Sequence, residues 1–259
     1  MAERQGGTDG GTDARERLAE TRARQERADK RRTRGIVVGV GAVAVAAVAV
    51  LAVVVARSGG DDEAPAYTGA LAPVSRQGDG SVLMAKAGVT RPVLEIFEDF
   101  QCPICKEVEH ASGPAIKEMA AKGEARVVYR PFQLFQGAQR EPLSSNSHRA
   151  ANAALCAPAE HWVAYHDALY AHQPDEGDKG FAADDLVAWG RQAGITGEDF
   201  AACVRTDAKS AQVAAMTAYA ERDRGVTGTP TVVLDGKPLD LQDRLLDPDA
   251  LREAVRRAR

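Results

Sequence analysis

The first strong hydrophobic signal is an unbroken segment from Gly35 to Ala56, which has no charged side chain and consists almost entirely of Val, Ala, Gly, Leu and Ile. A helix of this length is about 33 Å long, enough to cross a hydrocarbon core of ~30 Å. Lys and Arg are dense in residues 17–34, whereas only Arg57 follows closely. The positive-inside rule therefore predicts a transmembrane helix over 35–56, with a cytoplasmic N-terminus and everything after Arg57 outside.

A cleaved signal peptide is the alternative interpretation of this segment. The apolar region of a signal peptide is usually about 7–15 residues long, so we favour an uncleaved anchor that makes the protein a single-pass protein of the cell membrane. Residues 1–34 have almost no large apolar side chains and are expected to form a disordered cytoplasmic tail. Residues 57–68 predict a flexible linker, and residues 69–259 the folded, extracytoplasmic domain.

Beyond the linker the pattern changes to short strands and amphipathic helices, which predicts the α/β class. Runs of β-branched and aromatic residues predict strands at 93–97, 125–132 and 231–234, and Asp235-Gly236 predicts a hairpin turn. Apolar positions at helical spacing predict helices at 106–122, 147–157, 161–172, 182–193, 197–204, 208–222 and 251–257.

Composition narrows the classes of function. The chain is 44% hydrophobic and 27% charged, which excludes a collagen-like or wholly disordered protein. The net charge is −4, and the acidic excess falls after Arg57, which argues against a nucleic-acid partner. Disulfides persist outside the cytoplasm, so the predicted orientation allows oxidation of all four cysteines: Cys102, Cys105, Cys156 and Cys203.

The first two cysteines form Cys102-Pro103-Ile104-Cys105, between a predicted strand and a predicted helix. Pro103 suits the first position of a helix, which places Cys102 at the N-cap, beside unsatisfied backbone N–H groups. These groups and the helix dipole stabilise a thiolate, and only the thiolate attacks a disulfide or leaves from one. Pro114 is expected to kink or split this helix.

Two other interpretations of the motif carry less weight. Half of a structural zinc site would need a second pair of ligands at short spacing, but Cys156 and Cys203 stand singly, so we expect no metal. A purely structural Cys102–Cys105 bridge would close a tiny loop and contribute little stability.

A second motif, Gly225-Val-Thr-Gly-Thr-Pro-Thr231, opens the last predicted strand at Pro230. Taken alone, the Thr229–Pro230 peptide bond is expected to be trans, the commoner state of X–Pro bonds.

A strand ending in Glu-Asp-Phe-Gln, then Cys-Pro-Ile-Cys, helices, Gly-Thr-Pro-Thr and a final helix together resemble the DsbA-like thiol:disulfide oxidoreductases, of which membrane-anchored actinobacterial forms exist. The resemblance covers about residues 80–259. It implies a thioredoxin fold with an inserted α-helical domain, at about 138–215, and no cofactor. It also implies that Cys102 is the exposed nucleophile, Cys105 the resolving thiol, Pro230 a cis-proline facing them, and Thr229 a backbone contact for substrate chains.

Two positions depart from the family. DsbA has a histidine where this chain has Ile104, so the exchange centre is expected to be less oxidising. Thioredoxin-like proteins often carry a buried carboxylate six residues before the first cysteine, where this chain has Ile96. Glu98 shares the strand face of Ile96 and is a candidate for proton transfer, although a solvated acid at the strand end is the favoured interpretation.

Cys156 and Cys203 both fall in the predicted insertion. They are either buried free thiols or one structural disulfide, and the extracytoplasmic location favours the disulfide. The five histidines are scattered along the chain, and we assign them no chemistry: His110, His148, His161, His166 and His172.

The sequence therefore predicts a membrane-tethered thiol:disulfide oxidoreductase that acts as a dithiol oxidase on reduced or unfolded secreted proteins. The family implies reoxidation by a membrane partner of the DsbB or vitamin-K-epoxide-reductase type. Two alternatives stay open: a reductase or isomerase of the same fold, and a tethered chaperone-like binding module without redox turnover.

Overall fold

The computed structural model describes residues 67–239 and 245–259. All of these residues belong to one compact unit, Ala64–Arg259. The predicted tail, the transmembrane helix over 35–56 and most of the linker lie outside the described residues. Within 67–239 and 245–259, no helix is both long and apolar enough to cross a membrane.

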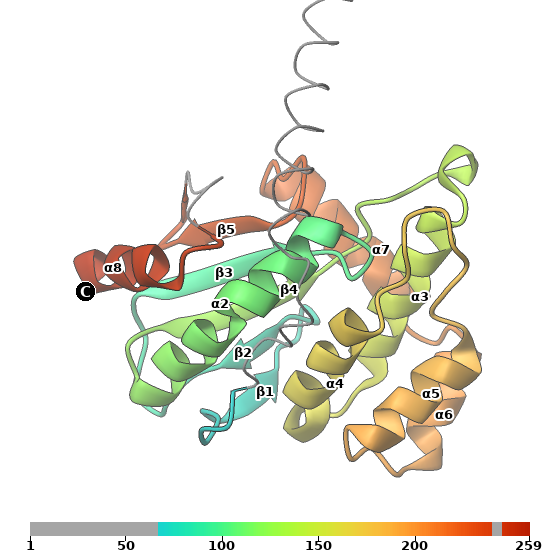
Figure 1. The fold of residues 1–259 in the computed structure, drawn as a ribbon, viewed down its shortest axis with the longest axis horizontal. Helices are drawn as coiled ribbons and strands as arrows, with labels where there is room; N and C mark the ends of the chain where they lie inside the picture. Colours follow the sequence, from blue (N-terminus) through green and yellow to red (C-terminus); the bar gives the residue numbers. More distant parts are fainter. Residues whose placement is uncertain (1–66, 240–244) are drawn as a thin grey trace, which may run out of the picture. The chain divides into compact units, whose positions relative to one another are not determined.

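A sheet of six strands runs through this unit in the order β1-β2-β4-β3-β5-β6 (Figure 1). The central strand β3 pairs in parallel with β4 and antiparallel with β5. The strands are β1 (Val74–Arg76), β2 (Val82–Met84), β3 (Val93–Glu98), β4 (Arg126–Pro131), β5 (Thr231–Leu234) and β6 (Lys237–Pro238). The three predicted strands are present, whereas β1, β2 and β6 are too short for their alternation to be recognised in the sequence.

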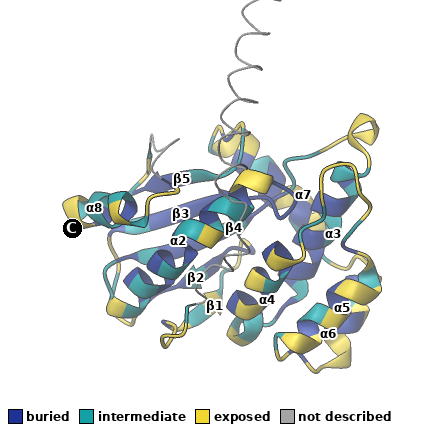
Figure 2. Cartoon of the chain, in the orientation of Figure 1, coloured by how far each residue is buried: buried dark blue, intermediate teal, exposed yellow. Residues whose placement is uncertain are grey.

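Helices cover both faces of the sheet, which explains why β3 is buried along nearly its whole length (Figure 2). Leu94 and Ile96 share a cluster with Ile116 of α2 (Pro103–Lys122) and Val255 of α8 (Pro248–Ala258). Phe97 belongs to a second hydrophobic cluster, which it forms with residues of α7 (Ser210–Ala218) and of its extension η2 (Tyr219–Asp223).

Between β4 and β5 the chain forms a group of helices beside the sheet (Figure 1). This order is the thioredoxin-like α/β fold with a helical insertion. The segment predicted as one helix over 208–222 ends its α-helical part at Ala218 and continues as a π-helical turn. The helices are η1 (Ala138–Arg140), α3 (Leu143–Cys156), α4 (Ala159–Ala171), α5 (Ala183–Gln192), α6 (Glu198–Arg205) and α7.

Local chemistry explains where α2 begins and ends. Cys102 is the N-cap with an extended backbone, and Pro103 occupies the first turn. Gly123 ends the helix with a left-handed φ of 76°, and its N–H binds the carbonyl of Ala120. Pro114 does not split the helix, which runs unbroken to Lys122.

Candidate active site

The Cys-Pro-Ile-Cys motif lies at the carboxyl end of β3, on the first turn of α2. Cys102 and Cys105 are free thiols in the structure. The backbone N–H of Cys102 binds the carbonyl of Asp99 at 2.9 Å, and the carbonyl of Cys102 accepts from Cys105 at 3.1 Å and Lys106 at 3.3 Å. The connection between β3 and α2 therefore holds the sulfur of Cys102 at the N-terminus of α2.

The two thiols have unequal acidity. A hydrogen bond with the Cys105 thiol lowers the pKa of Cys102 to about 7, helped by the backbone N–H groups of Cys105 and Ile104, against the effect of burial. Burial and the neighbouring Cys102 sulfur raise the pKa of Cys105 well above its usual value. Cys102 therefore ionises near neutral pH, whereas Cys105 keeps its proton.

The Thr229–Pro230 peptide bond is cis, and this segment faces Cys102. Because β5 is antiparallel to β3, the start of β5 lies at the end of β3, and the carbonyl oxygen of Thr229 comes within 3.3 Å of the Cys102 sulfur. The expectation of a trans bond from Pro230 alone is wrong, whereas the cis bond that the family resemblance implied is present.

The expectation of an exposed nucleophile is also wrong. Cys102 is only 5% exposed, because the carbonyl of Thr229 lies against its sulfur. Cys105 is 2% exposed, and Ile104 between them is 45% exposed. The accessible surface at the motif is therefore apolar, with the reactive sulfur just beneath it.

Asp99, which the sequence analysis did not select, organises the connection between β3 and α2. Its fully buried carboxylate accepts from the backbone N–H of Gln101 at 2.8 Å and of Leu134 at 2.8 Å, and from the hydroxyl of Ser147. Burial raises the pKa of Asp99, and these hydrogen bonds oppose the rise. An Asp directly after a buried strand is a turn-forming signal that would have identified it.

Gln173, just after α4, joins the helical insertion to the same connection. Its amide nitrogen donates to the carbonyls of Phe100 at 2.7 Å and Cys102 at 3.0 Å. In the opposite direction, the amide of Gln101 donates to the carbonyl of Pro174 at 3.0 Å. The insertion therefore contacts the backbone of the first motif cysteine directly. No periodicity or motif in the sequence marks Gln173.

Glu98 is 1% exposed, so the interpretation as a solvated acid is wrong. Its carboxylate lies 3.0 Å from Nε2 of His166, and the hydroxyl of Tyr170 donates to it at 3.3 Å. The Glu98 charge contributes to the raised pKa of Cys105. The assignment of no chemistry to His166 overlooked that it lies on the apolar stripe of its helix with Trp162 and Leu169, where a polar side chain needs a buried partner.

Around this pair lies a buried group of charges from α2 and α4. Burial disfavours protonation of His166, but the carboxylates of Glu98 and Glu109 outweigh it and raise its pKa to about 10. Lys117 binds Asp167 at 2.7 Å and lies 3.6 Å from Glu109. Single ligand atoms of Glu98, Glu109 and His166 lie within 4.8 Å of one another, so these are the described residues that could hold a metal ion.

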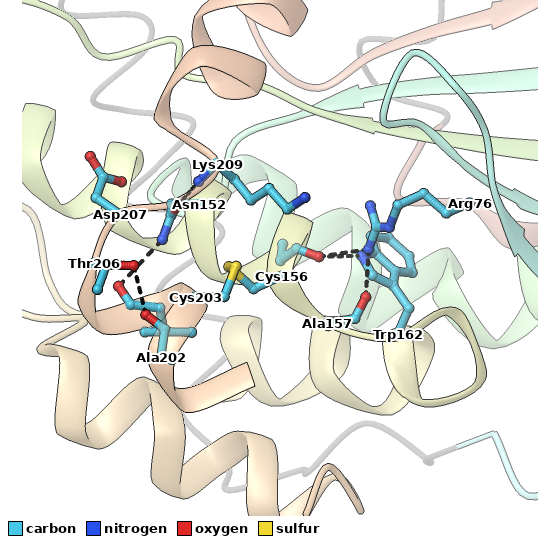
Figure 3. The surroundings of a disulfide bond; sticks show 12 residues. Arg76, Asn152, Cys156, Ala157, Trp162, Ala202, Cys203, Thr206, Asp207 and Lys209 are labelled. Carbon is cyan, nitrogen blue, oxygen red and sulfur yellow. Dashed lines mark hydrogen bonds between the residues drawn. A yellow bond between two sulfur atoms is a disulfide. The ribbon is translucent and has the colours of Figure 1, made fainter. Parts of the chain in front are cut away.

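Cys156 and Cys203 form a disulfide between α3 and α6, the pairing that the predicted extracytoplasmic location favours (Figure 3). The bridge lies at the carboxyl end of α3, where Arg76 donates to the carbonyls of Ala154 at 2.9 Å and Ala157 at 2.8 Å. These contacts beside the bridge are therefore those that end α3.

Comparison with known proteins agrees with this geometry. The family model described as thioredoxin matches residues 88–257. A search of curated proteins gives no match.

Solved structures with the same fold include the reduced disulfide bond oxidoreductase DsbG of Mycobacterium tuberculosis, at 26% identity over 67% of this chain and 82% of that chain, with a TM-score of 0.56. Oxidised DsbA of the same organism is 25% identical over 71% of this chain and 91% of that chain, with a TM-score of 0.57. MdbA, a thiol-disulfide oxidoreductase of Corynebacterium diphtheriae, shares the fold at 19% identity over 76% of this chain and 100% of that chain, with a TM-score of 0.60.

The family match covers more than half of the chain, and its span of residues 88–257 includes the helical insertion. The chain therefore belongs to the thioredoxin family, within it to the DsbA-type thiol:disulfide oxidoreductases.

Proposed function

We propose that the protein is a membrane-tethered dithiol oxidase that introduces disulfides into secreted proteins through Cys102 and Cys105. The observation that carries this proposal is the unequal acidity of the two thiols, with the pKa of Cys102 lowered to about 7 and that of Cys105 raised. A stabilised thiolate stabilises the reduced pair, which makes its disulfide a better oxidant.

In the proposed cycle a substrate thiolate attacks the Cys102 sulfur of the oxidised pair, and Cys105 leaves. A second thiolate of the substrate then attacks the substrate sulfur of this mixed disulfide, which releases an oxidised substrate and a reduced enzyme. Because Thr229 covers Cys102, we expect the backbone of an extended substrate to pair beside Thr229 and Pro230 as it reaches the sulfur. This mode of binding accepts many sequences.

The apolar segment over 35–56 supports an anchor in the cell membrane, with the N-terminus in the cytoplasm and the catalytic domain outside. A protein held there would be reoxidised by a membrane partner of the DsbB or vitamin-K-epoxide-reductase type. Protease treatment of intact cells tests the topology, since it should remove the domain after residue 57 and spare the N-terminal tail.

A reductase or isomerase is the second candidate. A pKa of about 7 for Cys102 is close to the value of ~7 in thioredoxin and far above the ~3.5 of DsbA. The reduction potential separates the two candidates. A value near or below about −270 mV, that of thioredoxin, would identify a reductant, and a value toward about −120 mV, that of DsbA, an oxidant.

The direct test supplies the full-length oxidised protein with a reduced, unfolded secreted protein and follows the loss of free thiols. The proposal expects stoichiometric transfer of one disulfide per protein molecule and repeated turnover when an oxidant is added. Binding of the unfolded protein without any loss of thiols would instead favour a chaperone-like module.

A further inference from the structure

One amide side chain joins the end of α4 to the backbone of the Cys-Pro-Ile-Cys motif. Nε2 of Gln173 donates to the carbonyl of Phe100 at 2.7 Å and to the carbonyl of Cys102 at 3.0 Å. The second of these bonds crosses 71 positions of the sequence, so it exists only because the helical insertion packs beside the motif. The amide therefore links the insertion to the residue that carries the attacking sulfur.

We propose that Gln173 is a positioning residue for Cys102, and that through it the helical insertion takes part in setting the reactivity of the attacking sulfur. The inference deepens the proposed function and rests on thiol–disulfide exchange at Cys102, but it holds for an oxidase and for a reductase alike. Gln173 acts on the sulfur through the backbone of Cys102.

The carbonyl of Cys102 is the first hydrogen-bond acceptor of α2. It accepts from the backbone N–H groups of Cys105 at 3.1 Å and Lys106 at 3.3 Å, and the amide of Gln173 is a third donor. The orientation of this peptide group fixes the first turn of the helix, and the first turn supplies the N–H groups of Ile104 and Cys105 that stabilise the thiolate. A donor that holds the Cys102 carbonyl therefore also holds those N–H groups in place.

The bond from Gln173 also changes the electrostatics of Cys102 directly. The carbonyl of Cys102 belongs to the same residue as the sulfur, and the negative end of its dipole disfavours a thiolate there. The amide N–H of Gln173 places positive charge against this oxygen. The bond therefore favours the thiolate over the thiol, which stabilises the reduced pair and makes its disulfide a better oxidant.

Gln173 is itself fixed at the end of a packed helix. Its backbone N–H binds the carbonyl of Tyr170 at 3.2 Å, and the ring of Tyr170 packs against Phe100 with the centroids 5.0 Å apart. In the opposite direction, the amide of Gln101 donates to the carbonyl of Pro174 at 3.0 Å. Two amides therefore join the end of α4 and the motif in opposite directions, which places the Gln173 donor before any substrate arrives.

The titratable groups that face Cys102 keep their protons at neutral pH. Cys105 on α2 and Tyr170 on α4 interact electrostatically with Cys102, and burial raises the pKa of both well above the usual values. On the side of β5, Thr229 and Pro230 carry no charge. A change in the titration of Cys102 between variants therefore reports on the substituted position.

The test is the pH dependence with which iodoacetamide alkylates Cys102 in the reduced full-length protein, since the reagent reacts with the thiolate. Gln173→Leu removes the donor and keeps the approximate size of the side chain, and Gln173→Glu replaces the donor by a carboxylate of the same shape. Asn146→Ala is the matched control, because the Asn146 amide donates to the carbonyl of Asp178 at 2.8 Å and so holds the loop after α4 at a position away from the motif.

The loss of one neutral hydrogen bond should move the alkylation midpoint of Gln173→Leu upward by about half to one pH unit. Gln173→Glu should move it further, because it adds a negative charge near the thiolate. In equilibrium with glutathione, the disulfide of both variants should be less oxidising, by up to about tenfold in the equilibrium constant. Asn146→Ala should keep the wild-type midpoint and the wild-type equilibrium.

An unchanged midpoint in Gln173→Leu would overturn the proposal. An equal shift in Asn146→Ala would overturn it too, because a loosened loop would then be sufficient to change Cys102. If Gln173→Leu does not fold, Gln173→Glu decides by the same two criteria. Alkylation needs no protein substrate, so this outcome is distinct from that of the proposed function, which depends on whether the wild-type protein removes thiols from an unfolded substrate.

Discussion

The two cysteine pairs of this protein differ in what surrounds the sulfur. Cys102 and Cys105 are free thiols on the first turn of α2, whereas Cys156 and Cys203 are bonded to each other across α3 and α6. At the first pair, backbone N–H groups approach one sulfur, and burial separates the acidities of the two thiols. At the second pair, the neighbouring groups terminate a helix.

This difference teaches which property makes a disulfide reactive. A pair exchanges when one sulfur is stabilised as a thiolate and the other is not, because the first is then a good leaving group and the second a thiol held for resolution. Cys156 and Cys203 instead join two packed helices, and we expect their bridge to contribute to stability.

Replacing Cys102 by Ser should have the largest effect on exchange. The variant lacks the attacking sulfur, so we expect disulfide transfer to an unfolded substrate to fall at least about 10³-fold, as when a nucleophile is removed from a catalytic unit. The double variant Cys156→Ser/Cys203→Ser should keep most of the activity. Normal transfer by Cys102→Ser, measured as loss of substrate thiols, would contradict the assignment of this pair.

Removing the second pair should instead reduce stability. The two cysteines are 47 residues apart, and a bridge over a loop of that length stabilises by about 4 kcal/mol in the chain-entropy model. The free energy of unfolding of Cys156→Ser/Cys203→Ser should therefore be lower by that amount. Circular dichroism in guanidinium chloride measures this loss as unfolding at a lower denaturant concentration. A loss of transfer activity in the still-folded variant would show that this pair also exchanges.

Replacing Cys105 by Ala should make Cys102 less acidic. The hydrogen bond with Cys105 is the main cause of the lowered pKa, and a hydrogen bond to a charged group is worth about 1.5 kcal/mol or more, roughly one pKa unit. The pH midpoint for alkylation of Cys102 by iodoacetamide should rise from about 7 by that amount. Cys105→Ser keeps a donor and should shift the midpoint less.

Replacing Ile104 by His should have the smallest effect of these changes, in the oxidising direction. A cationic side chain beside the Cys102 sulfur lowers its pKa further, and one pKa unit corresponds to about 30 mV at most in the potential of the pair. Equilibration with glutathione measures this shift, and Ile104→Gln serves as the uncharged control. A less oxidising potential in Ile104→His would mean that other contacts set the balance.

The sequence by itself determined the features that depend on neighbouring residues. The strand at 93–97, the helix opening at Pro103 and the hairpin at Asp235-Gly236 follow from local periodicity, capping and turn chemistry, because each is decided within a few positions. The placement of Cys102 at the N-cap follows from the same local rules.

Only the tertiary structure decided how the buried polar groups are paired. Glu98 and His166 are 68 residues apart, and they meet because α4 of the insertion packs against the end of β3. Cys102 was expected to be exposed to solvent, but the carbonyl of Thr229, 127 residues away, lies against its sulfur. A buried charge has to find its partner wherever packing brings one, so no local pattern predicts which residues will share a proton or cover a sulfur.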